Sequence, residues 1–204
     1  MSWSMWLGLL AICCLGAVSP GPSLAMVVRH TLGGGRAQGI ACAWAHSIGI
    51  GTYALITLLG LAAVLKHSPM LFKVIAIAGA LYLAWLGIKA LRSTGGMQQK
   101  LAAGKRSSVL EAARDGLAIS MLNPKIMLFF MALFSQFVLA AQHSAGKGLI
   151  VITPIVVDGL WYTFIAFMLS QPKILDKLRH NATVIDKLTG GVLLLLALRV
   201  VVSL

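Results

Sequence analysis

The sequence predicts an all-α integral membrane protein, in which six transmembrane helices form two inverted three-helix repeats. Three observations predict this fold: a composition suited to lipid, six apolar stretches of spanning length, and proline breaks at matching positions in the two halves. Of 204 residues, 59% are apolar and only 11% are charged. Charged residues make up about 25% of a typical soluble domain. The chain is therefore built for a bilayer rather than for water.

Six apolar stretches are each long enough to cross a bilayer, which takes about 20 residues at ~1.5 Å of rise per residue. The first of them differs from a secretion signal, because no Lys or Arg precedes it and its apolar part runs on past the usual length. We therefore expect it to be retained as a span. The three cysteines all fall inside predicted spans, and their odd number argues against a disulfide framework. The six stretches cover residues 4–28, 38–65, 70–91, 109–139, 147–171 and 186–204.

A polar segment at 93–108 divides the chain into two halves of three spans each. We therefore predict a first repeat at 1–92, a cytoplasmic linker at 93–108 and a second repeat at 109–204. Each half opens with a long apolar stretch that proline interrupts about 17 residues in. The two halves thus share a pattern as well as a number of spans.

A second match lies in the next span of each half, where a tyrosine follows a glycine at the same distance. Gly39 precedes Tyr53 by 14 residues, and Gly148 precedes Tyr162 by 14 residues. Together with the paired prolines, this spacing indicates an internal repeat.

Basic residues predict the orientation of the spans. Twelve Lys and Arg residues fall in one set of alternating loops and four in the other. By the positive-inside rule the larger set is cytoplasmic, so both termini face outward and the halves insert with opposite polarity into a bacterial inner (plasma) membrane. The net charge of +12 then reflects topology and contact with anionic lipid rather than nucleic-acid binding. The larger set is Arg29, Arg36, Lys89, Arg92, Lys100, Lys105, Arg106, Arg114, Lys173, Lys177, Arg179 and Lys187; the smaller is Lys66, Lys73, Lys147 and Arg199.

The proline breaks predict a polar cavity shared by the two halves. Proline removes a backbone donor and frees the carbonyl four residues earlier, which is costly in lipid unless that carbonyl faces protein or water. Inverted repeats with interrupted helices near the membrane midplane form a transporter architecture whose site lies between the repeats. The alternative is that each proline only kinks its helix and that neighbouring helices tolerate the kink.

Several motifs resemble those of the lysine exporter (LysE/RhtB) family of bacterial amino-acid efflux proteins. They are Ser19-Pro20-Gly21-Pro22, Gly33-Gly34-Gly35-Arg36 with Gly39, Tyr53 through Gly60, and Leu122-Asn123-Pro124-Lys125. The resemblance implies a secondary transporter that exports amino acids or derivatives, such as threonine, homoserine or lysine, driven by the proton gradient. The candidates for substrate binding or for helix breaks are Pro20, Gly21, Pro22, Tyr53, Asn123, Pro124, Lys125 and Tyr162.

Lys125 is the basic residue that falls deepest in a predicted span. Its distance from the start of the span is 16 residues, or ~24 Å of helix. A lysine near the bilayer centre costs roughly 2.5–3.5 kcal/mol on insertion scales, so it should face the protein interior and meet a partner. That partner is either a substrate carboxylate or the backbone carbonyls freed by Pro124.

Asp158 is the acidic residue that lies in mid-span, and an intramembrane carboxylate is a functional candidate by default. Helical spacing puts it on one face with Pro154, Trp161 and Tyr162. One hypothesis is that Asp158 lies near Lys125 and couples proton movement to transport. The alternative is a structural hydrogen bond or ion pair.

The second span places Cys42, His46, Gly49 and Tyr53 on one helix face. Cys42 with His46 resembles half of a metal site, which keeps a metal-ion or other small-solute efflux carrier as the alternative function. A metal site needs more ligands at that depth than the sequence offers, so we expect no metal and no cofactor. His46 is either a buried, hydrogen-bonded histidine or a second candidate for proton coupling.

Enzymatic activity is not predicted, because no nucleophile with a base, and no pair of acids, is gathered at one membrane interface. The expected partners are an amino-acid substrate, protons and membrane lipid, without nucleic acid. Self-association into a homo-oligomer is compatible with these features.

Overall fold

The computed structural model describes residues 2–19, 21–92, 107–134, 137, 144–169 and 180–202. Within these ranges the chain forms helices and no strand, which confirms the all-α class. Pro20 and residues 93–106 of the expected linker lie outside the described residues. The helices are α1 (Trp3–Val18), α2 (Pro22–Gly34), α3 (Arg36–His67), α4 (Pro69–Leu91), α6 (Val109–Met121), α7 (Pro124–Leu133), α9 (Ser144–Leu169) and α11 (Ala182–Val202).

Several of these helices are long and apolar enough to cross a membrane. Three qualify singly, over residues 36–60 of α3, 70–91 of α4 and 146–169 of α9. The bent pairs α1–α2 and α6–α7 also qualify when each pair counts as one span, which gives up to five. Over its described length α11 is not among them, because it carries Asp186, Lys187 and Arg199. The architecture is that of a multi-pass membrane protein.

The first break separates α1 from α2, whose axes differ by 59°. At the end of α1, the Ser19 N–H donates to the carbonyl of Leu15. Gly21 is the N-cap of α2 and Pro22 its first residue. Proline suits that position because an N–H there has no partner within the helix.

The second break separates α6 from α7, whose axes differ by 50°. Asn123 is the N-cap of α7, and its Oδ1 accepts a hydrogen bond from the Lys125 N–H at 3.0 Å. Pro124 is the first residue of α7. In both breaks, therefore, a proline opens a new helix rather than kinking a continuous one.

The loop that the apolar stretches predict at 29–37 is largely helical. Charge ends the apolar stretch at Arg29, but α2 continues to Gly34 because the polar side chains beyond Arg29 find partners. His30 is buried, with Nε2 3.1 Å from an Asp115 oxygen and Nδ1 2.7 Å from the Ser107 hydroxyl of the segment before α6. Only Gly35, with φ of 110°, separates α2 from α3.

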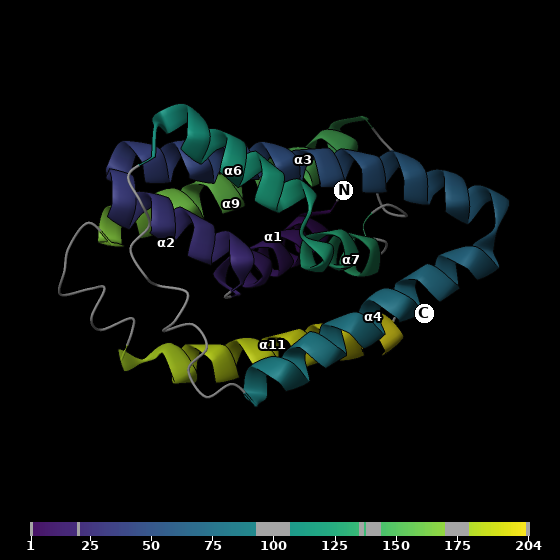
Figure 1. Ribbon diagram of the computed structural model, residues 1–204. Helices are drawn as coiled ribbons and strands as arrows, with labels where there is room; N and C mark the ends of the chain where they lie inside the picture. The colour runs from purple at the N-terminus through teal and green to yellow at the C-terminus, as the bar shows by residue number, and fades with distance from the viewer. Residues whose placement is uncertain are drawn as a thin grey trace.

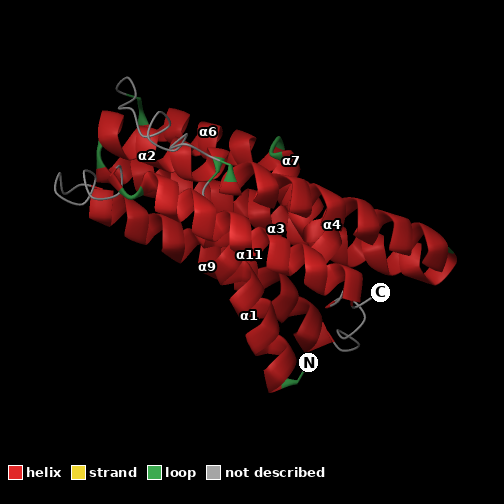
Figure 2. Ribbon diagram, turned by 90° about the horizontal axis from the view of Figure 1, so that it is seen from below, coloured by secondary structure: helices red, strands yellow, loops and turns green. Residues whose placement is uncertain are grey.

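The helices form a bundle with α3 and α9 near its centre. The α3 helix packs against α2, α6 and α9, and α9 also packs against α1 and α2. The α4 and α11 helices run side by side along one flank (Figure 1). The two ends of the chain lie toward the same side of the bundle in both ribbon views (Figures 1 and 2).

Close helix crossings occur where glycine removes the side chain. A Cβ on Gly87 of α4 would lie 2.9 Å from the Gly190 carbonyl oxygen, and a Cβ on Gly190 of α11 would lie 2.6 Å from the Gly87 carbonyl oxygen. On the other flank, Gly116 of α6 lies against the backbone of Cys42 in α3. Small residues that bring backbones together are typical of helix packing in membranes.

Candidate functional site

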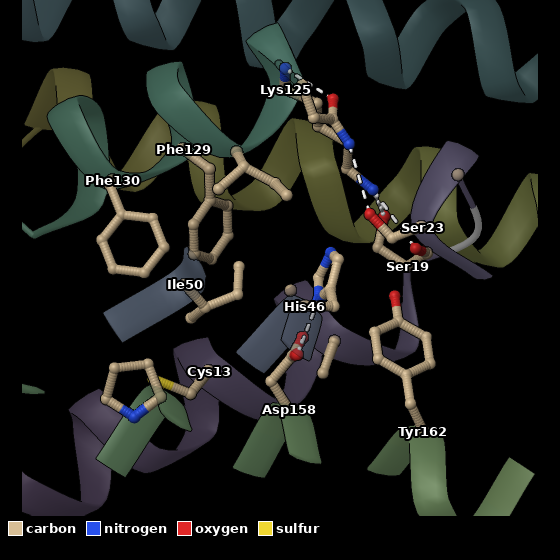
Figure 3. A pocket seen from close by; sticks show the side chains of 16 residues that line it. Cys13, Ser19, Ser23, His46, Ile50, Lys125, Phe129, Phe130, Asp158 and Tyr162 are labelled. Carbon is tan, nitrogen blue, oxygen red and sulfur yellow. Dashed lines mark hydrogen bonds and ion pairs between the residues drawn. The ribbon is translucent and has the colours of Figure 1, made fainter. Parts of the chain in front are cut away.

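A cavity of about 60 Å³ lies where the two helix breaks meet α3 and α9 (Figure 3). One water needs roughly 10–15 Å³ on this scale, so the cavity suits a small solute and not a peptide. It contains residues from both halves of the chain. The sequence-predicted residues that line it are Gly21, His46, Asn123, Lys125, Asp158 and Tyr162.

Lys125 joins the second break to the first. Its ammonium donates to the Ser19 hydroxyl at 2.6 Å and to the Ser19 carbonyl at 3.2 Å. The carbonyl at the end of α1 would otherwise lack a helical partner. The sequence left two partners open, a substrate carboxylate or a carbonyl freed by Pro124, and the structure supplies a carbonyl and a hydroxyl from the other half of the chain.

Asn123 makes a second link between the breaks. While its oxygen caps α7, its Nδ2 donates to the hydroxyl of Ser23 at 3.3 Å. Both side chains are buried. The first turns of α2 and α7 are therefore held next to each other at the cavity, and the positive ends of two helix dipoles meet there.

His46 and Asp158 form a buried pair across α3 and α9. His46 Nδ1 lies 2.7 Å from Asp158 Oδ2, and the two residues are 1% and 6% exposed. His46 Nε2 is buried and has no hydrogen-bond partner among the described residues. In Figure 3 the imidazole stands between Asp158 on one side and Lys125, Ser19 and Ser23 on the other. Nδ1 is thus bonded to Asp158, and Nε2 is the ring nitrogen without a hydrogen-bond partner in the described part of the chain.

The direct partner of Asp158 is therefore His46. Lys125 and Asp158 line the same cavity, and the Lys125 ammonium donates to Ser19. Coupling between the two charged groups stays a prediction. Along α9, Pro154 and Tyr162 share the cavity wall with Asp158, and Trp161 does not. The Tyr162 hydroxyl points toward Ser19 and Ser23 (Figure 3).

Tyr53, Pro22 and Pro124 stand outside the cavity wall. The Tyr53 hydroxyl donates to the Met121 carbonyl at 2.7 Å, in the last turn of α6 where that carbonyl lacks a helical partner. Its ring also stacks on Phe130, which does line the cavity. Tyr53 therefore supports the second break from outside the cavity. Pro22 and Pro124 are the first residues of α2 and α7.

The cavity has a polar and an apolar part, and the apolar part was not found from the sequence. Phe129 and Phe130 follow Lys125 by one helical turn, which is the periodicity that would have indicated them. Ser23 carried no comparable signal, because its role depends on how α2 meets α7. The polar lining residues are Ser19, Ser23, His46, Asn123, Lys125, Asp158 and Tyr162; the apolar ones are Cys13, Gly16, Ala17, Ile50, Ile126, Phe129 and Phe130.

The arrangement offers binding chemistry rather than metal chemistry. Across the described ranges, no group of three or more His, Cys, Asp or Glu side chains is placed to hold a metal ion. Cys42, which the sequence pairs with His46, is fully buried in a separate apolar cluster with Val27 and Val28 of α2. What the cavity presents is one cation, one anion and a histidine.

The LysE type translocator family model matches residues 14–204. A leucine efflux protein from Enterobacter sp. (strain 638) is 26% identical, with 87% of this chain and 83% of that protein covered. A homoserine/homoserine lactone efflux protein from Salmonella typhimurium is 28% identical, covering 78% and 77%. A threonine efflux protein from Escherichia coli (strain K12) is 26% identical, covering 91% and 92%. No solved structure matches the chain.

The family match extends over both helix breaks and over every cavity-lining residue except Cys13. It confirms the resemblance carried by the Ser19–Pro22 and Leu122–Lys125 motifs. A translocator also agrees with the apolar helices and with the absence of an enzyme-like cluster in the sequence. The chain thus belongs to the LysE type translocator family and is a membrane transport protein, not an enzyme.

Proposed function

We propose that this protein is a secondary transporter that exports amino acids or their derivatives from the bacterial cytoplasm in exchange for protons. The observation that carries the proposal is that a single cavity holds Lys125, Asp158 and His46. Lys125 and Asp158 match the two charged groups of an amino acid, and His46 adds a side chain that can carry a proton. The similarity to leucine, homoserine and threonine efflux proteins supports the same substrate type.

The carboxylate of the substrate is expected at the helix breaks. The first turns of α2 and α7 both point their dipoles' positive ends at this part of the cavity. Lys125 adds a full positive charge there, at present directed to Ser19. A substrate carboxylate would share the ammonium with Ser19 and extend the bridge that already joins the two halves.

The ammonium group of the substrate is expected at the His46–Asp158 pair. With a neutral imidazole the pair carries one negative charge, and with a proton on Nε2 its net charge is zero. A substrate ammonium is attracted by the first state and not by the second. Proton and substrate therefore compete for the same site, which is the requirement for exchanging one against the other across a membrane.

We further propose six spans arranged as two inverted repeats, at 1–92 and 109–204, joined by a cytoplasmic linker at 93–108. The paired breaks and the reciprocal Gly87–Gly190 contact support a symmetric arrangement. Chain ends on the same side of the bundle support an even number of spans, with α11 as the sixth (Figure 1). The twelve-to-four basic asymmetry supports outward termini in the inner membrane.

Purified protein in proteoliposomes tests the function. When protons flow out of the vesicles down an imposed pH gradient, the vesicles should accumulate a radiolabelled neutral amino acid against its own gradient. Collapse of the gradient with a protonophore should abolish accumulation and leave exchange. Failure of every amino acid to move, with transport of a metal ion or another small solute instead, would overturn the proposal in favour of the alternative carrier.

A further inference from the structure

We propose that the cavity selects amino acids with uncharged, apolar side chains, and that Gly16 and Phe129 determine the size of side chain it accepts. This inference rests on the proposed amino-acid transport and adds the substrate class. Two features of the cavity carry it: the number and position of its charged groups, and the composition of the part that faces away from them.

The carboxylate and the ammonium group that every amino acid carries would pair with all the charged groups of the cavity. Among the described lining residues, the charged side chains are Lys125 and Asp158, and His46 is bonded to Asp158. Lys125 would meet the carboxylate, and the His46–Asp158 pair, which carries one negative charge when the imidazole is neutral, would meet the ammonium. A lysine or glutamate side chain would bring a third charge without a counter-ion, and an unpaired charge out of water is strongly unfavourable.

The remaining wall of the cavity is apolar. Ile50 of α3, Ala17 of α1 and the rings of Phe129 and Phe130 of α7 form it. In Figure 3 these rings and Ile50 stand on the side away from Ser19, Ser23 and Tyr162. A substrate held by its charged groups at the polar part therefore extends its side chain into apolar surroundings. Burial of an apolar side chain there is favourable, because it removes apolar surface from water.

Gly16 and Phe129 set the depth of this apolar part. A Cβ placed on Gly16 would lie 2.6 Å from Cζ of Phe129, so the ring rests directly on the α1 backbone. Both residues line the cavity, and Phe129 is only 7% exposed. A methyl group at position 16 must push the ring into the cavity or occupy that space itself. Either way the apolar part loses volume.

Exchange in proteoliposomes tests the substrate class. Vesicles containing the full-length protein are loaded with one unlabelled amino acid and diluted into the same amino acid in radiolabelled form, so that no net proton movement is needed. Leucine and methionine should exchange at least about tenfold faster than lysine or glutamate, the scale of discrimination available to pocket contacts. Lysine exchange as fast as leucine exchange would overturn this inference and leave amino-acid transport intact. Exchange of no amino acid would instead overturn the proposed function.

Size selection is tested with Gly16→Ala against Gly8→Ala, the same substitution in the same helix. A Cβ on Gly8 would meet nothing nearer than 3.8 Å. Gly16→Ala should slow leucine exchange about tenfold relative to alanine exchange, and Gly8→Ala should leave the ratio unchanged. Phe129→Leu should raise phenylalanine exchange relative to leucine exchange.

The double variant Gly16→Ala with Phe129→Leu separates selection from misfolding. Since leucine lacks the ring atom that the new methyl group would meet, the double variant should regain leucine exchange that Gly16→Ala loses. Equal ratios in the two glycine variants, or no recovery in the double variant, would overturn the assignment of Gly16 and Phe129.

Discussion

The ammonium group of Lys125 lies 2.6 Å from the hydroxyl of Ser19, so that the helix break in one half of the chain holds the break in the other. Lys125 also donates to the Ser19 carbonyl at 3.2 Å, which gives that carbonyl a partner at the end of α1. The same lysine faces the cavity. It therefore links the two breaks, and in the proposed mechanism it also binds the substrate carboxylate.

Lys125→Met should reduce amino-acid exchange by roughly 10- to 100-fold, because hydrogen bonds to charged groups contribute about 1.5–3 kcal/mol. Ser19→Ala should cost less, since the Ser19 carbonyl remains as a partner. Lys89→Met is the control, because its ammonium lies 5.2 Å from the centre of the Trp85 ring and is not part of the cavity wall. Normal exchange in Lys125→Met would remove this lysine from the substrate path.

Asp158→Asn should abolish proton-driven accumulation while retaining part of the exchange activity. Exchange needs binding and the conformational change but no net proton movement, whereas accumulation needs the negative charge of the His46–Asp158 pair. Asp115→Asn is the matched control, because Asp115 also bonds a histidine but lies outside the cavity. Accumulation by Asp158→Asn at the parental level would place proton coupling elsewhere.

Asn123→Ala should destabilise the protein by about 1 kcal/mol through loss of the α7 cap, which corresponds to a fall of about 2–4 °C in the midpoint of thermal unfolding. It also removes the bond to Ser23, so exchange should fall as well. Pro124→Ala should have a smaller effect, because an N–H at the first helical position needs no helical partner. If Pro124→Ala lowered the unfolding midpoint and the exchange rate as much as Asn123→Ala, the proline would be as important to the break as the Asn123 cap.

Gly190→Ala should lower the thermal stability by about 1–3 kcal/mol, the usual cost of overpacking. Its methyl group would meet the Gly87 carbonyl oxygen at 2.6 Å. Gly191→Ala, one position further along the same helix, places its Cβ where nothing lies within 4 Å and should be neutral. Similar unfolding temperatures for the two variants would show that α4 and α11 adjust their crossing freely.

Single cysteines test the orientation in a variant that lacks Cys13, Cys14 and Cys42. By the basic-residue asymmetry, Gln98→Cys should react with a thiol reagent only after the reagent enters the cytoplasm, and Ser144→Cys should react from outside. Intact and permeabilised cells treated with a membrane-impermeant maleimide supply the measurement. The reverse pattern, or equal labelling of both, would contradict six spans with outward termini.

Candidate residues for the cavity could be predicted from the sequence, and their contact partners could not. Lys125, Asp158 and His46 were singled out because they are polar residues inside apolar stretches, and the structure brings all three to one cavity. The identity of each contact depends on how helices rotate and cross. For that reason Ser19 as the partner of Lys125, and Phe129 as part of the wall, follow only from the assembled bundle.

Helix ends were hardest to predict where a charged residue ends an apolar stretch but the helix continues. The apolar stretch stops at Arg29, but buried His30 bonds to Asp115 on a helix far away in sequence, and α2 continues to Gly34. Hydropathy measures the cost of placing a side chain in lipid, but the His30 side chain is buried against other parts of the protein. The two proline breaks could be found from the sequence because their cause is local: Pro22 and Pro124 are each the first residue of a helix, a position that suits proline.

The Gly87–Gly190 crossing sets an order of events during synthesis. About 90 residues separate the end of α4 from the start of α11, which a ribosome takes roughly 5–20 s to translate at about 5–20 residues per second. For that interval α4 is already made but lacks the helix whose backbone fits its glycine. The later of the two helices to leave the ribosome, α11, therefore completes this flank, and until then the face of α4 around Gly87 lacks its partner.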